Sequence, residues 1–416
     1  MSSTYPHPMA RVWTGLALAV AVLLTAAITL PPAVAESSAA GPGDPVPFTL
    51  AAPTGPEQIG TFELHLIDTE RPDPWADGGG PRELMISLWY PARHDPAAPP
   101  TPYLPARVAS FYNQTSAELG IVKDAVDFAG ATTHAQTRAA VAGAEPRPVV
   151  LYSPGGGRPR FLGTQQVEDL VSRGYVVVTV DSTYQAPVEF PDGLTMPARG
   201  VDLKQALAER VRDLSFVLDQ LELLQAGANP DVDGRDLPAG IGATLDLSRV
   251  GMFGHSMGGF AAAETMITDD RIDAGVNLDG SMGRKYQGRP DATLDRPFLL
   301  MGGGTDGESD RPHTHRGAPD WADYWGRFTG WKRDLYLPAA EHMSFTDLQT
   351  LLPEVGTELD LDQEAVRAAI GTVDPAAGLA VQRAYLAAFF DQHLNDRPQP
   401  ILDTVPAEHR IAELIS

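Results

Sequence analysis

The chain has 416 residues, 43% of them hydrophobic, so it is long enough to bury a sizeable core. Its formal net charge is −23 and it holds no dense Lys/Arg cluster, which excludes a partner, such as nucleic acid, that is bound through its phosphates. The absence of cysteine excludes disulfides, a thiolate nucleophile and zinc–thiolate sites.

The first 35 residues have the layout of a secretory signal peptide. Arg11 precedes an apolar run at residues 15–30, and Ala33-Val34-Ala35 supplies a small-residue cleavage site. An uncleaved membrane anchor is the alternative, but the run is shorter than the roughly 20 apolar residues that span a bilayer. We therefore expect a secreted protein, cleaved after Ala35 on the general secretory route. Residues 36–47, rich in Ser, Ala, Gly and Pro, should form a flexible leader, and residues 48–416 a single domain.

Strands and helices are predicted to alternate along this domain. Residues 62–67 and 84–90 form an antiparallel strand pair, and residues 93–145 form loops and short helices. Further strands are expected at 148–152, 175–180, 249–253, 274–278, 297–301 and 333–337, and helices at 162–173, 203–224, 260–265 and 378–394. This order predicts an α/β fold, with a mostly parallel central sheet and helices on both faces.

Polar residues and glycines gather where the predicted strands end. Parallel sheets place their sites at the carboxyl ends of their strands. The residues at these ends are Gly156, Asp181, Ser256, Asp279, Asp306 and His342. A site at this edge of the sheet is therefore expected. Residues 184–197 follow one of these ends and form either part of the pocket wall, a partial lid or a plain surface loop.

Residues 254–259, Gly-His-Ser-Met-Gly-Gly, match G-x-S-x-G between a strand and a helix. In that context the serine occupies a sharp turn that raises its hydroxyl above the sheet, and glycine on each side avoids a clash with nearby backbone. The helix N-terminus also favours a developing negative charge. Ser256 is therefore the predicted nucleophile.

A serine nucleophile needs a base, and the base needs an acid to orient it. His342 follows a late strand by a short loop and is the predicted base. His255 lies within the turn, with its side chain expected to point away from the Ser256 oxygen, and His313 and His315 lie in a polar loop. Asp279 and Asp306 both satisfy the chain order Ser, Asp, His. Asp279 ends a strand directly and is favoured because it is held more rigidly.

Two backbone N–H groups are expected to bind the oxyanion of the reaction intermediate. One belongs to Met257, which follows the serine, and the other to the glycine loop at residues 155–157. Gly156 is our choice within this loop, with Gly155 and Gly157 as alternatives.

The sequence resembles the platelet-activating factor acetylhydrolases of the plasma and intracellular-II type, which are α/β-hydrolases. The resemblance covers about residues 48–394 and rests on residues 84–91, 150–157, 246–259, 277–279 and 341–345. It implies that Asp279 is the acid and that the substrate is a lipid ester with a short acyl group. Residues 254–259 also resemble cutinase-like lipases, whose acid would correspond to Asp306. Pro154 departs from the acetylhydrolase pattern, which commonly has His there.

These features together predict a secreted serine esterase that forms an acyl-enzyme and needs neither a metal nor a cofactor. Residues 231–236 resemble a calcium loop only loosely, because the glycine is misplaced and no glutamate follows at the required spacing. The expected partner is a small or lipid ester, with transient contact to lipid aggregates. A triacylglycerol lipase or a cutinase-like polyester hydrolase is the alternative enzyme. A binding protein on an inactive hydrolase scaffold is the alternative of a different class.

Overall fold

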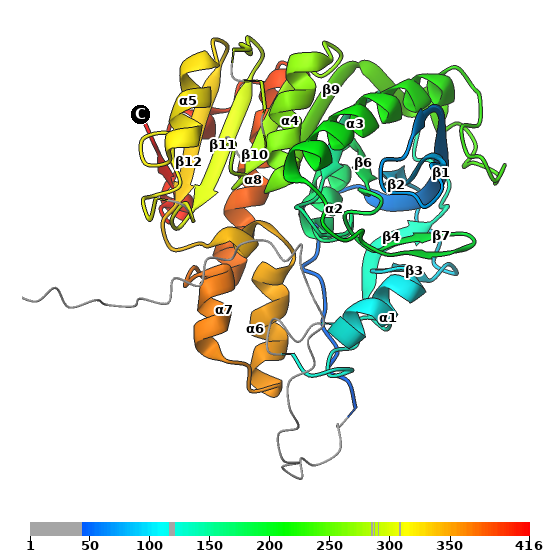
Figure 1. Ribbon diagram of the computed structural model, residues 1–416, viewed down its shortest axis with the longest axis horizontal. Coiled ribbons are helices and arrows are strands. Elements are labelled where there is room, and N and C mark those ends of the chain that lie inside the picture. Colours follow the sequence, from blue (N-terminus) through cyan, green and yellow to red (C-terminus); the bar gives the residue numbers. More distant parts are fainter. Residues whose placement is uncertain (1–43, 116–120, 284–285, 287, 290, 308) are drawn as a thin grey trace, which may run out of the picture.

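The computed structural model describes residues 44–115, 121–283, 286, 288–289, 291–307 and 309–416. Parallel strands form the centre of the sheet in Figure 1. In spatial order they are β12 (Lys332–Leu337), β11 (Phe298–Gly303), β10 (Ala274–Leu278), β9 (Leu245–His255), β5 (Arg147–Ser153) and β6 (Val176–Val180). Every residue of β6 and β10 is buried, as expected for strands covered on both faces.

Further strands extend the sheet at both edges. Next to β6 lie β2 (Pro81–Ala92), β1 (Gln58–Pro72), β4 (Thr132–Thr137) and β3 (Pro100–Pro102), and next to β12 lies β13 (Glu413–Leu414). The long hairpin of β1 and β2 is antiparallel, and β2 is also antiparallel to β6. A separate small hairpin consists of β7 (Val188–Phe190) and β8 (Gly193–Thr195).

Helices cover both faces of the sheet. One face packs against α3 (Leu203–Gln225), α4 (Met257–Thr268) and α5 (Pro319–Arg327), and the other packs against α2 (Thr164–Ser172) and α8 (Pro375–Leu394). Short 3-10 turns lie at η2 (Gly242–Thr244), η4 (His342–Phe345), η5 (Pro400–Leu402) and η6 (Ala407–His409). Within the described parts of the chain, we find no helix long and apolar enough to cross a membrane.

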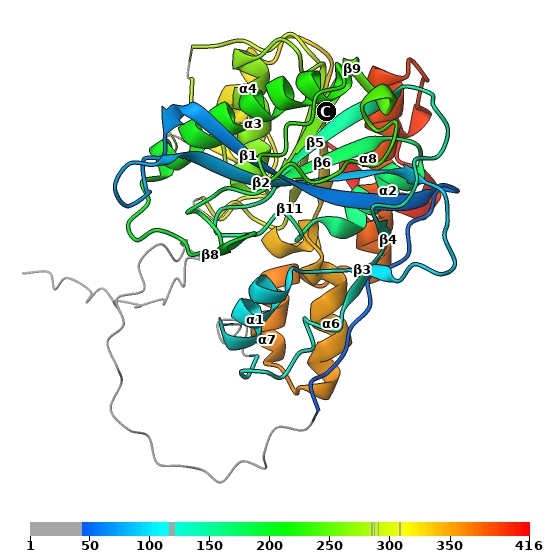
Figure 2. The ribbon, with the colours of Figure 1, turned by 90° about the vertical axis from the view of Figure 1, so that its right-hand side faces the viewer.

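A second, smaller layer lies beyond one edge of the sheet. It contains α1 (Ala106–Thr115), α6 (Leu348–Glu358) and α7 (Gln363–Ile370), which Figure 2 shows grouped together below the sheet. These helices share a hydrophobic cluster that includes Val108, Leu351 and Ile370. The turn η4, which begins with His342, leads directly into this layer.

Residues 46–57, which we call the N-terminal strap, run along this layer and the sheet. Val46 is buried and donates its N–H to the carbonyl of Ala125. Further along the strap, the carbonyls of Ala51 and Ala52 accept hydrogen bonds from Arg383 on α8 at 2.8 and 2.7 Å. The strap therefore joins the N-terminal part of the described chain to helix α8.

The expected α/β fold, with a mostly parallel central sheet and helices on both faces, is confirmed by the order and pairing of the strands. Two details differ from the expectation. Residues 93–145 contain two strands, β3 and β4, in addition to α1, and the leader expected over residues 36–47 is already packed at Val46. Residues 1–43, including the expected signal peptide, lie outside the described residues.

Candidate active site

Ser256 lies at the sharp turn between β9 and α4. Its φ of 55° and ψ of −125° place it in the left-handed half of backbone space, where a non-glycine residue is strained. The turn fits against β5 only because small residues flank it. A Cβ on Gly258 would lie 1.9 Å from the Ser153 carbonyl oxygen, and one on Gly254 would lie 2.3 Å from the carbonyl carbon of Gly258. Close packing at this point therefore accounts for the two glycines.

Three of the predicted residues form one hydrogen-bonded chain. His342 Nε2 lies 3.0 Å from Ser256 Oγ, and His342 Nδ1 lies 2.7 Å from Asp279 Oδ2. The residues come from different elements: Ser256 from the β9–α4 turn, Asp279 from the end of β10, and His342 from the loop after β12. The His342 side chain is 41% exposed, whereas Asp279 is buried, so the chain runs from the surface into the protein. This geometry allows a proton to pass from the serine to the imidazole.

Asp279 is fixed by two further donors besides His342. Its Oδ1 accepts a hydrogen bond from the Gly303 N–H at 2.9 Å and one from His313 Nδ1 at 2.7 Å. Burial alone would raise the pKa of Asp279, but the charges and hydrogen bonds of His313 and His342 outweigh it and hold the pKa well below its usual value. Asp279 is therefore kept ionised inside the protein.

His313, which was expected only in a polar loop, is a member of this site. It is buried and its ring packs on Trp321, with the ring centroids 4.1 Å apart. Burial lowers the pKa of His313, but the adjacent Asp279 carboxylate raises it by more, so the net shift is upward. His313 lies 34 residues from Asp279 in the sequence, and no local pattern signals their contact.

His255 supports the site from inside the turn. Its Nε2–H donates to the carbonyl oxygen of His342 at 2.9 Å, and its side chain does not point to the Ser256 oxygen. Burial, with a smaller contribution from His342, lowers the pKa of His255 to about 3. The neutral ring therefore acts as a fixed donor that holds the backbone of His342.

The other strand-end aspartates are engaged elsewhere. Asp306 accepts hydrogen bonds from the backbone and side chain of Ser309 within its own loop, so the structure brings Asp279, and not Asp306, to His342. Asp181 forms a buried ion pair with Arg160. The loose calcium-like segment is occupied internally, because Asp231 pairs with Arg235. In the described parts of the chain, no group of three His, Cys, Asp or Glu side chains is arranged to hold a metal ion.

The glycine loop after β5 lies directly beside Ser256. A Cβ on Gly155 would be 3.3 Å from Ser256 Cβ and 2.9 Å from His255 Nδ1, and a Cβ on Gly156 would be 3.5 Å from Met257 Cε. No acceptor among the described residues takes a hydrogen bond from the Gly156 N–H. The Gly156 backbone thus lies next to the Met257 side chain, close to the turn that carries the serine.

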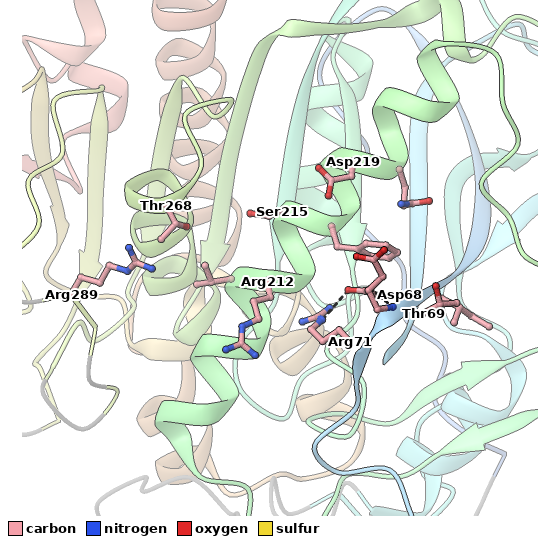
Figure 3. A pocket seen from close by; sticks show the side chains of 13 residues that line it. Asp68, Thr69, Arg71, Arg212, Ser215, Asp219, Thr268 and Arg289 are labelled. Carbon is pink, nitrogen blue, oxygen red and sulfur yellow. Dashed lines mark hydrogen bonds and ion pairs between the residues drawn. The ribbon is translucent and has the colours of Figure 1, made fainter. Parts of the chain in front are cut away.

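A separate groove of about 660 Å³ lies between the end of β1 and helix α3. Figure 3 shows Arg71 bound to Asp68 there, with Arg212 and Arg289 further along the lining. Its lining includes none of the residues around Ser256, and cations and carboxylates are mixed along it. The groove is therefore not part of the candidate site.

Comparisons with known proteins connect this geometry to esterases. No family model matches the sequence. The solved structure of a ferulic acid esterase from Streptomyces cinnamoneus is similar with a TM-score of 0.72 and 38% identity, covering 88% of this chain and 99% of that one. A probable 1-alkyl-2-acetylglycerophosphocholine esterase from Arthroderma benhamiae is 25% identical over 389 residues, 86% of this chain and 91% of the relative. A platelet-activating factor acetylhydrolase from Bos taurus is 27% identical over 181 residues, 37% of this chain and 40% of the relative.

Proposed function

We propose that Ser256 is the catalytic nucleophile of this chain, which is an esterase of the α/β-hydrolase fold and is similar to platelet-activating factor acetylhydrolases. The chain is a carboxylic ester hydrolase. The hydrogen-bonded chain of Ser256, His342 and Asp279, with contacts of 3.0 and 2.7 Å, is the observation that supports this assignment most directly.

The proposed reaction has two halves joined by an acyl-enzyme. Ser256 Oγ bonds to the ester carbonyl carbon while its proton moves to His342 Nε2. The tetrahedral intermediate then collapses, and the alcohol leaves with the proton from His342. Water next gives a proton to His342 and attacks the acyl carbon. As the second intermediate collapses, His342 returns this proton to Ser256 Oγ and the acid is released. Asp279 orients His342 and stabilises its charged form throughout.

In both halves the carbonyl oxygen carries negative charge, which the N–H groups of Gly156 and Met257 are proposed to stabilise. Their positions support this role, because the Gly156 loop and the start of α4 lie on either side of the serine. Donors aimed at a developing oxyanion in a water-poor site lower the barrier substantially, and losing one costs about 10²–10³-fold in kcat.

The proposed substrates are lipid-like esters with a short acyl group. The names of two relatives support this class: a probable 1-alkyl-2-acetylglycerophosphocholine esterase from Arthroderma benhamiae and a platelet-activating factor acetylhydrolase from Bos taurus. An aromatic acyl ester is the second candidate, because the solved structure that is 38% identical to this chain is that of a ferulic acid esterase. Long-chain triacylglycerols and polyesters are the further alternatives that the resemblance to cutinase-like lipases raises.

The nucleophile is tested by comparing hydrolysis of p-nitrophenyl acetate by the wild type and Ser256→Ala. We expect a loss of at least about 10⁴-fold in kcat for Ser256→Ala. Ser248→Ala is the control, because it removes a hydroxyl from the opposite end of the same strand. A burst of one p-nitrophenol per protein would support the acyl-enzyme. Full activity of Ser256→Ala would overturn the assignment.

The substrate class is tested by comparing kcat/KM for 1-alkyl-2-acetylglycerophosphocholine, methyl ferulate, and p-nitrophenyl esters of two to sixteen acyl carbons. A preference for the acetylated phospholipid and for the shortest acyl group is the expected result. A preference for methyl ferulate would assign the aromatic class, and a preference for the longest acyl groups would assign a lipase.

We further propose that the protein is exported, on the basis of the signal-peptide pattern in residues 1–35. N-terminal sequencing of protein recovered from the culture medium tests this. A mature chain that begins with Glu36 is expected, and retention of residues 1–35 would refute cleavage after Ala35.

A further inference from the structure

Arg210 is a buried cation that the mechanism above does not use. It lies on α3 and is only 1% exposed. None of the ion pairs found among the described residues includes Arg210. Burial is the main influence on its pKa, lowering it to about 10, so the guanidinium is still charged at neutral pH. A buried charge is costly unless its donors are used, so these contacts need an explanation.

Most hydrogen bonds of the Arg210 guanidinium go to the glycine loop and the end of the strand before it. One terminal nitrogen donates to the carbonyl of Pro154 and, at 3.3 Å, to Ser153 Oγ, and the other donates to the carbonyl of Gly155 at 3.1 Å. Its Nε donates to Gln185 Oε1 at 2.7 Å, and Gln185 is itself anchored to the carbonyl of Ala206. The planar fork of Arg210 thus spans two consecutive carbonyls of the loop beside Ser256.

Holding these two carbonyls also fixes two N–H groups. In a trans peptide unit, the carbonyl of one residue and the N–H of the next lie in one plane and point in opposite directions. The peptide bonds of the described chain are trans. When Arg210 draws the Gly155 carbonyl toward α3, the Gly156 N–H is directed to the opposite side. In the same way, its bond to Pro154 directs the N–H of Gly155.

The loop also lies beside the serine. The Cβ position of Gly155 lies 3.3 Å from Ser256 Cβ, and the Gly156 N–H has no acceptor among the described residues. Glycine has no side chain that could hold these peptide planes by packing, and it rotates more freely than other residues. The Arg158 N–H also donates to the Gly155 carbonyl at 3.2 Å, but it belongs to the same turn and cannot anchor that turn to a helix.

We propose that Arg210 is a positioning residue for the oxyanion hole, which locks the peptide planes of the glycine loop so that the Gly156 N–H points at the reacting carbonyl oxygen. This inference rests on the proposed serine mechanism. It assigns to helix α3 a role in the transition state that no catalytic motif in the sequence indicates.

The test uses Arg210→Lys, which keeps the charge but loses the fork, and Arg210→Met, which loses both. Because the donors act on the transition state, kcat should fall about 10–100-fold for Arg210→Lys while KM stays within about twofold. Arg383→Lys is the matched control, since Arg383 is also buried and also donates to backbone carbonyls, here of Ala51, Ala52 and Gln165.

A second readout separates positioning from general loss of structure. Each variant is assayed on a phenyl ester and on the matching thionoester, in which sulfur replaces the carbonyl oxygen and accepts hydrogen bonds poorly. The wild type should strongly prefer the oxygen ester, and Arg210→Lys should lose about tenfold of this preference. A variant that is merely less folded would lose both rates equally and keep the ratio.

The outcomes are distinct. An unchanged oxygen-to-sulfur ratio in both Arg210 variants, or an equal fall in Arg383→Lys, would overturn the positioning role. If Ser256→Ala is inactive and the Arg210 ratio is unchanged, only this inference fails. If Ser256→Ala is active, the proposed function fails as well. Should Arg210→Met not fold, Arg210→Lys still decides the question through the ratio.

Discussion

Replacing His313 with phenylalanine should lower kcat only indirectly, because His313 contacts Asp279 and neither Ser256 nor His342. The phenyl ring can keep the packing on Trp321, but the Nδ1–H donor to Asp279 Oδ1 at 2.7 Å is lost. A hydrogen bond to a buried charged group contributes about 1.5–3 kcal/mol, so we expect the free energy of unfolding to fall by about 2 kcal/mol. Asp279 keeps Gly303 and His342 as partners, and we expect a fall in kcat of about tenfold from its looser orientation.

The same substitution has a pH signature. The charge and hydrogen bond of His313 lower the pKa of Asp279, so their removal raises that pKa. Asp279 then becomes protonated at a higher pH than in the wild type. The acid limb of kcat/KM for p-nitrophenyl acetate should therefore move to higher pH, and the loss of activity should be larger at pH 5 than at pH 8.

The chain contains a closely matched control for this experiment. His315 donates its Nδ1–H to Asp334 at 2.7 Å and stacks on Trp325 with ring centroids 4.0 Å apart, but Asp334 lies on β12 outside the site. His315→Phe should lose similar stability in urea unfolding and keep wild-type kcat. Wild-type kcat and an unshifted acid limb in His313→Phe would refute the reasoning, as would an equal loss of activity in His315→Phe.

Two further predictions follow from the site. In Gly258→Ala, the new Cβ would lie 1.9 Å from the Ser153 carbonyl oxygen, so we expect a loss of about 1–3 kcal/mol in stability and of about 100-fold in kcat/KM. The control Gly326→Ala, in helix α5 with nothing within 4 Å, should be neutral or slightly stabilising by thermal unfolding, and equal losses in the two variants would contradict this account. Asp279→Asn should cost about 3 kcal/mol of stability at pH 7, because it breaks a buried charge pair. Since the pKa of Asp279 is lowered in the folded state, its contribution is present above its unfolded pKa of about 4 and is lost as the pH falls through the folded value. The stability gap to the wild type should thus stay constant from pH 7 to about pH 5 and narrow as the pH falls below about 4. A gap that does not narrow below about pH 4 in urea unfolding would refute the assigned charge state.

The central fold was predictable because its strands are short apolar runs between turn signals. The strand expected at residues 175–180 corresponds to β6 (Val176–Val180), and the strand expected at 274–278 to β10 (Ala274–Leu278). The missed strands have no such pattern. β3 (Pro100–Pro102) contains two prolines, and β4 (Thr132–Thr137) is mostly polar, so both depend on pairing with the rest of the sheet.

The site was predictable where its residues follow strand ends, and not where they meet from distant loops. Ser256 and Asp279 lie at positions that a parallel sheet brings to one edge, which is visible in the order of elements. His313 and Arg210 carry no such signal. Arg210 lies on an amphipathic helix, where an arginine is usually solvated, and only the structure shows that it faces the glycine loop.

The N-terminal strap has a consequence for the order in which the molecule can assemble. The N–H of Thr49 donates to Glu354, 305 residues later, and Ala51 accepts from Arg383, 332 residues later. The partners of the strap on α6 and α8 are therefore among the last residues to be synthesised. Contacts between residues so far apart in the sequence form late and slowly, because the chain must lose the entropy of closing a long loop before the contacts add stability. The strap also bonds to earlier residues such as Ala125 and Gln165. It can therefore dock on these first, and its contacts with α6 and α8 are expected to close last.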